Sequence, residues 1–187
     1  MNLMESINKV FLPYLDHMGS KIDIFTTLSH GLLICLPFSV FVLVTFLWRP
    51  RLWLHSLPAD IQQMAGPKTE AEKKTTQNLL LPIFLFILPG LSIASVFYLN
   101  WTTSIDFALM NILFHLYGIW LIVHLWDLLI IDLGFVIWID PSHPPIQGTE
   151  EAKGWKNLGF HFRSFLKATI MSVIFVLPIS LLLSILL

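Results

Sequence analysis

The sequence predicts an all-α, polytopic membrane protein with four transmembrane helices and an N-terminal amphipathic helix that lies in the membrane interface. Of the 187 residues, 56% are hydrophobic and only 12% are charged, which is more apolar than a soluble domain of this length requires. The apolar residues also form four runs of at least the roughly 20 residues that a helix needs to cross the hydrocarbon core. We therefore treat residues 1–187 as a single membrane domain.

The predicted spans are residues 22–48, 79–99, 105–139 and 165–187. Prolines within or near the ends of these spans are expected to kink the helices without abolishing them, because neighbouring groups satisfy the freed carbonyls. The only cysteine, Cys35, lies in the first span and has no partner in the chain for a disulfide. We expect it to be a small buried hydrophobic residue.

The third apolar run is too long for the membrane alone. A helix over residues 105–139 would extend about 52 Å at about 1.5 Å per residue, well beyond the hydrocarbon thickness. The run contains no turn sequence near its middle, and two spans here would reverse the charge pattern of the loop that comes after it. One tilted span that continues past the membrane surface is therefore expected.

Residues 1–21 have one apolar stripe at helical spacing, interrupted by Lys9, Asp16 and His17. Such a segment is expected to lie in the interface and not to form a fifth span. The first long apolar run exceeds the hydrophobic region of a signal peptide, and no small-residue cleavage site follows it. We expect this run to remain as an anchor.

Lysine and arginine set the predicted orientation. They collect in the connections 49–78 and 140–164, which we place in the cytoplasm, with both termini on the opposite side. The expected location is an integral membrane one, in a bacterial inner membrane. Within residues 49–78, Thr69 and Glu72 have capping-box spacing, and Glu70 with Lys74 has i,i+4 spacing, so a helix should enter the second span from about Thr69. The rest of this connection is expected to be a solvated loop with interfacial anchors.

The stretch "HLWDLLIIDLGFVIWID" places His124, Asp127 and Asp132 in an apolar run. On a regular helix His124 projects between the two carboxylates, which lie about 140° apart around the axis. Because carboxylates facing lipid are costly, this polar sector should turn toward protein or a wet cavity. The "GTEE" turn and His161 should fold back toward it. The candidate polar or metal site comprises His124, Asp127, Asp132, Glu150, His161 and Arg163.

The segments "DLLIIDLGFVIWID", "QGTEEAKGW" and "FHFRSFLKA" resemble an uncharacterised group of small bacterial multi-pass membrane proteins. These have an Asp-containing membrane helix, a Pro-Gly-Thr-Glu-like turn and a Phe-His-Phe motif before the last helix. The resemblance covers roughly the last third of the chain, and Gln147 stands where the pattern has proline. It implies that the neighbourhood of Glu150 and His161 is a shared feature, and it implies no particular reaction.

Several interpretations of the polar residues stay open. The site residues are ligands that Zn or Fe accepts, so a divalent metal is one hypothesis, although their spacing matches no metal motif. A structural cluster that ties the last connection to the third span is another. His30 and His115 lie in different spans, and nothing in the sequence pairs them around a haem. Asn111 and His115 share a helix face and are expected to hydrogen-bond to a neighbouring helix.

The sequence has no nucleophile elbow, phosphate loop or basic block, which argues against the corresponding hydrolases, nucleotide-binding enzymes and nucleic-acid partners. The expected function is that of a small accessory, transport-associated or scaffold subunit in the lipid bilayer, acting with membrane-protein partners or as a homo-oligomer. The alternative is a membrane-embedded enzyme or metal-binding protein that uses the His, Asp and Glu residues on the cytoplasmic side.

Overall fold

The computed structural model describes residues 22–187 except residues 104 and 106, and this part of the chain is helical with no β-strand. Four helical segments are long and apolar enough to cross a membrane: Ile24–Trp48, Glu70–Thr102, Leu109–Trp138 and Leu158–Leu186. The all-α fold with four spans is therefore confirmed, and the chain is an integral membrane protein. The predicted interfacial helix, residues 1–21, lies outside the described residues.

The first span is α2 (Ile24–Trp48), and it is followed by the short helices η1 (Pro50–Ser56) and α3 (Ala59–Ala65). The second span joins α4 (Glu70–Pro82), the π-helical turn η2 (Ile83–Ile87) and α5 (Leu88–Thr102). The third span joins α6 (Leu109–Trp126), the π-helical turn η3 (Asp127–Asp132) and the short helix η4 (Val136–Trp138). After η5 (Lys153–Lys156), the last span is α7 (Leu158–Leu186).

Side-chain caps fix where the long helices begin. The Asp23 carboxylate accepts the backbone N–H of Thr26 at 2.8 Å at the start of α2. At the start of α4 the predicted capping box is present, with Thr69 and Glu72 each accepting the other's backbone N–H. The predicted pair of Glu70 with Lys74 is wrong, because Glu70 contacts Lys73 at 2.7 Å instead. Both spacings place a lysine beside Glu70 on the helix surface.

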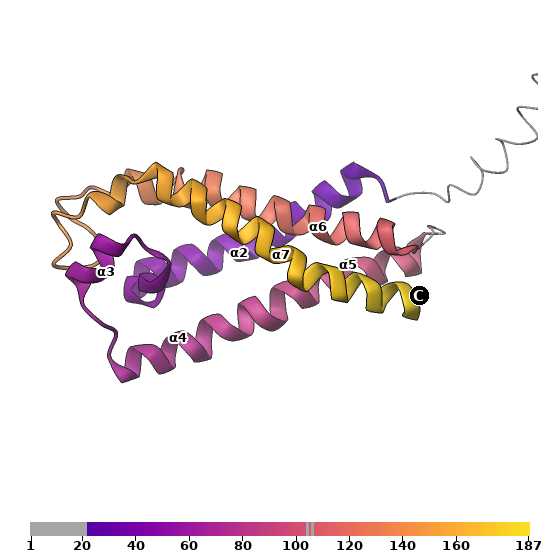
Figure 1. The fold of residues 1–187 in the computed structure, drawn as a ribbon, viewed down its shortest axis with the longest axis horizontal. Helices are drawn as coiled ribbons and strands as arrows, with labels where there is room; N and C mark the ends of the chain where they lie inside the picture. The colour runs from indigo at the N-terminus through magenta and orange to yellow at the C-terminus, as the bar shows by residue number, and fades with distance from the viewer. Residues whose placement is uncertain (1–21, 104, 106) are drawn as a thin grey trace, which may run out of the picture.

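Helix α6 packs against both α2 and α7 and forms the centre of the bundle (Figure 1). Two glycines let α2 and α6 approach closely. A Cβ atom on Gly118 would lie 2.6 Å from Cγ2 of Thr27, and one on Gly31 would lie 2.9 Å from Cδ1 of Ile122. Small residues at a helix crossing favour packing in lipid, where contact between helices replaces the hydrophobic effect as the driving force.

The two basic connections lie at the same end of the bundle, which we call the loop end (residues 49–69 and 139–157), opposite the C-terminus (Figure 1). This arrangement agrees with the charge-based topology, in which both connections share one side of the membrane. At the loop end α4 lies apart from α7, while α6 and α7 stay side by side (Figure 1). The assignment of the loop end to the cytoplasm stays a prediction.

The loop end has a small hydrophobic core of its own, which the sequence pattern did not predict. Trp155 is fully buried there with Leu54, Leu57 and Ile61 from the first connection and Ile146 from the second. The expectation of a solvated loop is therefore wrong for residues 52–61. The leucines and the isoleucine of η1 and α3 are spaced so that their side chains face this core. Burial of this apolar surface holds the two connections together.

A tight backbone approach completes the docking of α3 on η5. The Gly154 N–H donates to the Asp60 carboxylate at 2.7 Å, and a Cβ on Gly154 would collide with that same carboxylate and with Pro58. Glycine is therefore required at this position by the contact itself. The two connections consequently form one folded unit beneath the spans.

Candidate functional site: a cavity lined by histidine and aspartate

The α6 helix changes to π geometry where its aspartates occur. The Leu133 N–H donates to the carbonyl of Leu128, five residues earlier, at 2.9 Å. The i→i+5 hydrogen bond of a π turn reduces the rotation between residues five apart, so Asp127 and Asp132 lie closer around the axis than on a regular α-helix, and both line the same cavity. The separation of about 140° that we expected from a regular α-helix is wrong across this turn. The π turn instead directs both carboxylates to one side, as such turns often do at functional sites.

His161, near the start of α7, meets this face. Its Nδ1 lies 3.0 Å from Oδ2 of Asp132, and the residue is only 3% exposed. The cap that begins α7 fixes this position, because the Asn157 side chain accepts the Phe160 N–H at 3.0 Å. The predicted return of His161 toward the aspartates is thus what the geometry shows. A carboxylate at Nδ1 keeps the proton there and leaves Nε2 as the second functional atom.

A cavity of about 1210 Å³ opens beside this contact. It is lined by His124, Asp127, Asp132, His161 and Arg163 of the candidate site. Its apolar lining includes Phe38 and Val42 from α2, Phe84 and Leu88 from the second span, Trp120 and Val123 from α6, and Trp53, Leu57 and Val136 at the loop end. We call His124, Asp127, Asp132 and His161 the cavity cluster. The cavity therefore combines apolar and ionisable side chains along its lining.

Some residues that line the cavity, on the second and last spans, are exposed. Phe84 on η2 is 37% exposed, and Arg163 and Lys167 on α7 are exposed although they line the cavity. These residues lie on the second and last spans, and α4 and α7 lie apart at the loop end (Figure 1). A molecule in the bilayer could therefore enter from the side.

The cavity cluster contains polar atoms that lack partners. Nε2 of His124 and Nε2 of His161 are buried and have no hydrogen-bond partner among the described residues. The Asp127 carboxylate has neither a hydrogen bond nor an ion pair within the described part of the chain. Buried polar groups without partners are rare and costly in native proteins, and each requires an explanation.

Glu150, the remaining predicted site residue, lies apart from the cavity. Its carboxylate accepts the backbone N–H of Gly148 at 3.0 Å, within its own turn, and this bond lowers its pKa below the ordinary value. The threonine of the "GTEE" turn is buried and bonds the loop end, with Thr149 Oγ1 donating to the Ile146 carbonyl at 2.6 Å. The Thr149 side chain therefore has a structural role. Glu150 is not among the residues that line the cavity, and its inclusion in the site stays a prediction.

The arrangement offers no ready-made metal site. In the part of the chain that the structure describes, no group of three or more His, Cys, Asp and Glu residues is placed to hold a metal ion. The metal hypothesis therefore rests on residue types alone. What the cavity cluster offers is hydrogen-bond acceptors, a negative charge and a histidine positioned by an aspartate.

A second polar group lies nearer the other end of the bundle. His115 is 1% exposed, and its Nδ1 and Nε2 are hydrogen-bonded to Thr27 at 2.8 Å and to Ser95 at 2.7 Å. Ser95 is also hydrogen-bonded to His30 Nδ1 at 2.7 Å. We call Thr27, His30, Ser95 and His115 the inner histidine network. It joins α2, α5 and α6, which confirms the predicted role of His115 in binding a neighbouring helix.

The inner histidine network does not resemble a haem site. The two imidazole ring centres lie 5.5 Å apart, and the Ser95 hydroxyl is hydrogen-bonded to both rings. A bis-His haem would require the iron and macrocycle between the rings. No local sequence signal marks this pairing, because the serine between the histidines lies in a third helix.

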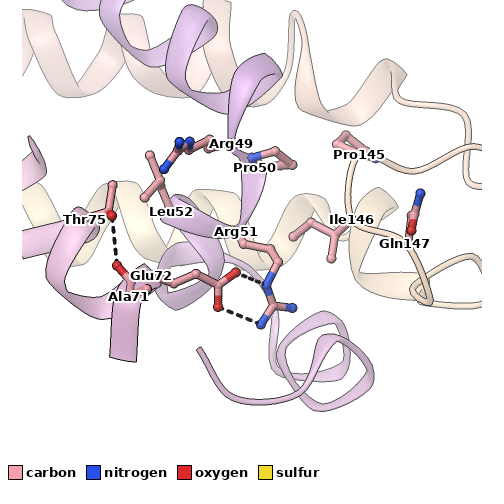
Figure 2. A pocket seen from close by; sticks show the side chains of 10 residues that line it. All are labelled: Arg49, Pro50, Arg51, Leu52, Ala71, Glu72, Thr75, Pro145, Ile146 and Gln147. Carbon is pink, nitrogen blue, oxygen red and sulfur yellow. Dashed lines mark hydrogen bonds and ion pairs between the residues drawn. The ribbon is translucent and has the colours of Figure 1, made fainter. Parts of the chain in front are cut away.

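A second hollow of about 620 Å³ lies outside the bundle, where η1, the start of α4 and residues 145–147 meet (Figure 2). Arg51 crosses it and forms a two-pronged contact with Glu72, with Nε at 2.6 Å and Nη2 at 3.3 Å from the carboxylate oxygens (Figure 2). Its Nη1 also donates to the Ala65 carbonyl at 2.8 Å. The guanidinium nitrogens of Arg51 are hydrogen-bonded within the protein. Arg51 therefore stabilises the loop end, and the hollow has few polar groups free to bind a ligand.

Lys68 and His55 also belong to this folded connection. Lys68 donates to the Leu52 carbonyl at 2.6 Å, and its partial burial lowers its pKa. Burial also lowers the pKa of His55, which lines the cavity mouth, and the nearby Lys68 cation lowers it further. Both effects favour a neutral His55 at the mouth at neutral pH.

Comparisons with protein-family models, with curated proteins and with solved structures found no match. The function must therefore be inferred from the fold and the cavity. The fold and the cavity define the chain as a four-span helical membrane protein with an open cavity lined by apolar and ionisable side chains.

Proposed function

We propose that the chain binds a lipid from the surrounding bilayer in this cavity and acts as a small accessory or transport-associated membrane protein. In this proposal the acyl chains lie against the apolar wall and the head group lies at the cavity cluster. The observation that carries it is a cavity of about 1210 Å³ whose lining combines aromatic and aliphatic side chains with ionisable ones, among them Asp127 and Asp132.

The size and polarity of the cavity support an amphiphile. Pockets for drug-sized ligands occupy roughly 300–1,000 Å³, so this cavity suits a larger molecule. Both aromatic and aliphatic side chains and ionisable side chains line the cavity, and a lipid has groups that match each kind. A purely structural role for the cluster would instead pair each of its polar groups with protein.

Lipid retention tests this proposal. The full chain is purified in a mild detergent, and bound phospholipid is counted by native mass spectrometry. Ala168→Trp puts a large side chain on the cavity wall and is expected to reduce bound lipid at least tenfold. The matched control is Ile170→Trp on the same helix, where the native side chain is 68% exposed, and it should retain lipid as the parent protein does. Equal retention by both variants would reject the proposal.

A second candidate is catalysis on a bound lipid, and the contact between Asp132 and His161 favours it. An aspartate beside Nδ1 of a histidine in a residue that lines a cavity is part of the arrangement of a general base. The His161→Gln variant should then abolish turnover of a radiolabelled phospholipid mixture while lipid retention persists. If the parent protein releases no product from that mixture, this candidate is removed and the binding proposal is unaffected.

A further inference from the structure

The two halves of the second span are fastened to different parts of the molecule. The first half, α4, packs against η1, where Arg51 contacts Glu72 at 2.6 Å and Lys68 donates to the Thr76 hydroxyl at 3.0 Å. The second half, α5, packs against α6 and α2, and the inner histidine network joins it to both. The position of α4 is therefore set by the loop end, and that of α5 by the bundle.

The turn between these halves has the features of a hinge. None of the residues of η2 is buried, the turn is π-helical, and Pro82 and Pro89 stand on either side of it. Each proline lacks the N–H that would bond to the preceding turn, so the backbone here is less completely bonded than in a regular helix. Pro37 and Pro178 lie within uninterrupted α-helices, so a proline alone does not produce such a turn.

The hinge adjoins the cavity, whereas α4 leaves the cavity uncovered. No residue of α4 is among the described side chains that line the cavity, although η2 directly after it contributes Phe84. The Phe84 ring meets the rings of Phe38 and Trp53 edge to face, with centroid distances of 6.3 Å and 6.1 Å. On α7 the lining residues Arg163 and Lys167 are exposed, and α4 lies apart from α7 at this end of the bundle (Figure 1).

From these observations we infer that α4 is a lid, which turns about η2 toward α7 and closes the cavity over its contents. The ring contacts of Phe84 hold the hinge against the bundle while α4 moves. The contact of Arg51 with Glu72 holds α4 against η1 and so keeps the lid open (Figure 2). A molecule in the cavity that contacts α4 only in the closed position favours that position. The inference goes beyond lipid binding, because it does not depend on which molecule fills the cavity.

Distances between α4 and α7, measured by double electron–electron resonance, test the lid. The full chain with Cys35→Ser is placed in lipid nanodiscs and carries nitroxide labels at Gln77→Cys on α4 and Leu166→Cys on α7, both exposed positions. We expect two populations whose distances differ by about 5 Å or more. A reference pair at Met110→Cys and Leu166→Cys, on the packed helices α6 and α7, should give one population.

Two variants separate the hinge from the contact that holds the lid open. Glu72→Gln removes the charge that binds Arg51 but keeps a capping-box residue, so it should enrich the shorter distance by about threefold or more. The double variant Pro82→Ala, Pro89→Ala restores both N–H donors and should leave one population. The matched control is Pro178→Ala in the uninterrupted helix α7, which should keep both populations.

Four results would overturn the inference. These are a single α4–α7 population in the parent chain, two populations that persist when Pro82 and Pro89 are replaced, an unchanged ratio in Glu72→Gln, and two populations in the reference pair, which would indicate motion of the whole bundle. Loss of the two populations in Pro178→Ala would equally count against a hinge at η2. None of these results depends on lipid retention, so the lid and the proposed function can fail separately.

Discussion

The inner histidine network and the cavity cluster are both polar groups within an apolar bundle, but they differ in how far their hydrogen bonds are completed. In the inner histidine network both ring nitrogens of His115 have partners, on two neighbouring helices. In the cavity cluster His161 is buried to a similar degree, yet only its Nδ1 has a contact and its Nε2 has none among the described residues.

This difference in completed hydrogen bonds separates the structural role of the inner histidine network from the binding role that we propose for the cavity cluster. A buried polar group with all its partners ties helices together, whereas one left without a partner lowers stability. Proteins retain such unfavourable groups mainly where a ligand or a reaction uses them. The cavity beside the incomplete cluster supplies the space that a ligand would need.

The largest effect on stability is expected at the inner histidine network. His115→Leu keeps an apolar side chain of similar size but removes both hydrogen bonds, leaving the Thr27 hydroxyl only a 3.4 Å contact with the Asp23 carbonyl. The free energy of unfolding should fall by about 2 kcal/mol. Denaturant titration in detergent micelles, followed by tryptophan fluorescence, measures this change.

The control for that measurement is His143→Leu, because the His143 side chain is 86% exposed at the loop end. Its free energy of unfolding should match that of the parent protein. A loss as large in His143→Leu as in His115→Leu would show that the assay does not report on the inner histidine network, and no loss in either would remove its structural role.

The sequence was sufficient to predict the features that depend on local pattern. Apolar run length located the four spans, and the spacing of Thr69 and Glu72 located the start of α4. The polarity of His124, Asp127 and Asp132 in an apolar run indicated an inward-facing sector, and these residues line the cavity. Each of these predictions depends on hydrophobicity or on neighbours a few residues apart.

Features that depend on contacts between distant segments were missed. The core around Trp155 joins two connections, and the inner histidine network depends on Ser95 from a third helix. The π turn at Asp127 has no sequence signature in its apolar residues, so a regular helix predicted the wrong angle between the aspartates. The local bond of Glu150 to the Gly148 N–H is likewise not visible in the spacing that suggested it as a site residue.

The central claim is that the cavity cluster is maintained for a ligand at the expense of stability, and the unfolding free energy of Asp127→Leu tests it most directly. Replacing an unpartnered carboxylate with an apolar side chain of similar size removes its desolvation cost. In lipid-free detergent we expect Asp127→Leu to raise the free energy of unfolding by about 1 kcal/mol, opposite in sign to His115→Leu. A decrease in Asp127→Leu comparable to that in His115→Leu would contradict the claim, because it would show that the carboxylate stabilises the fold.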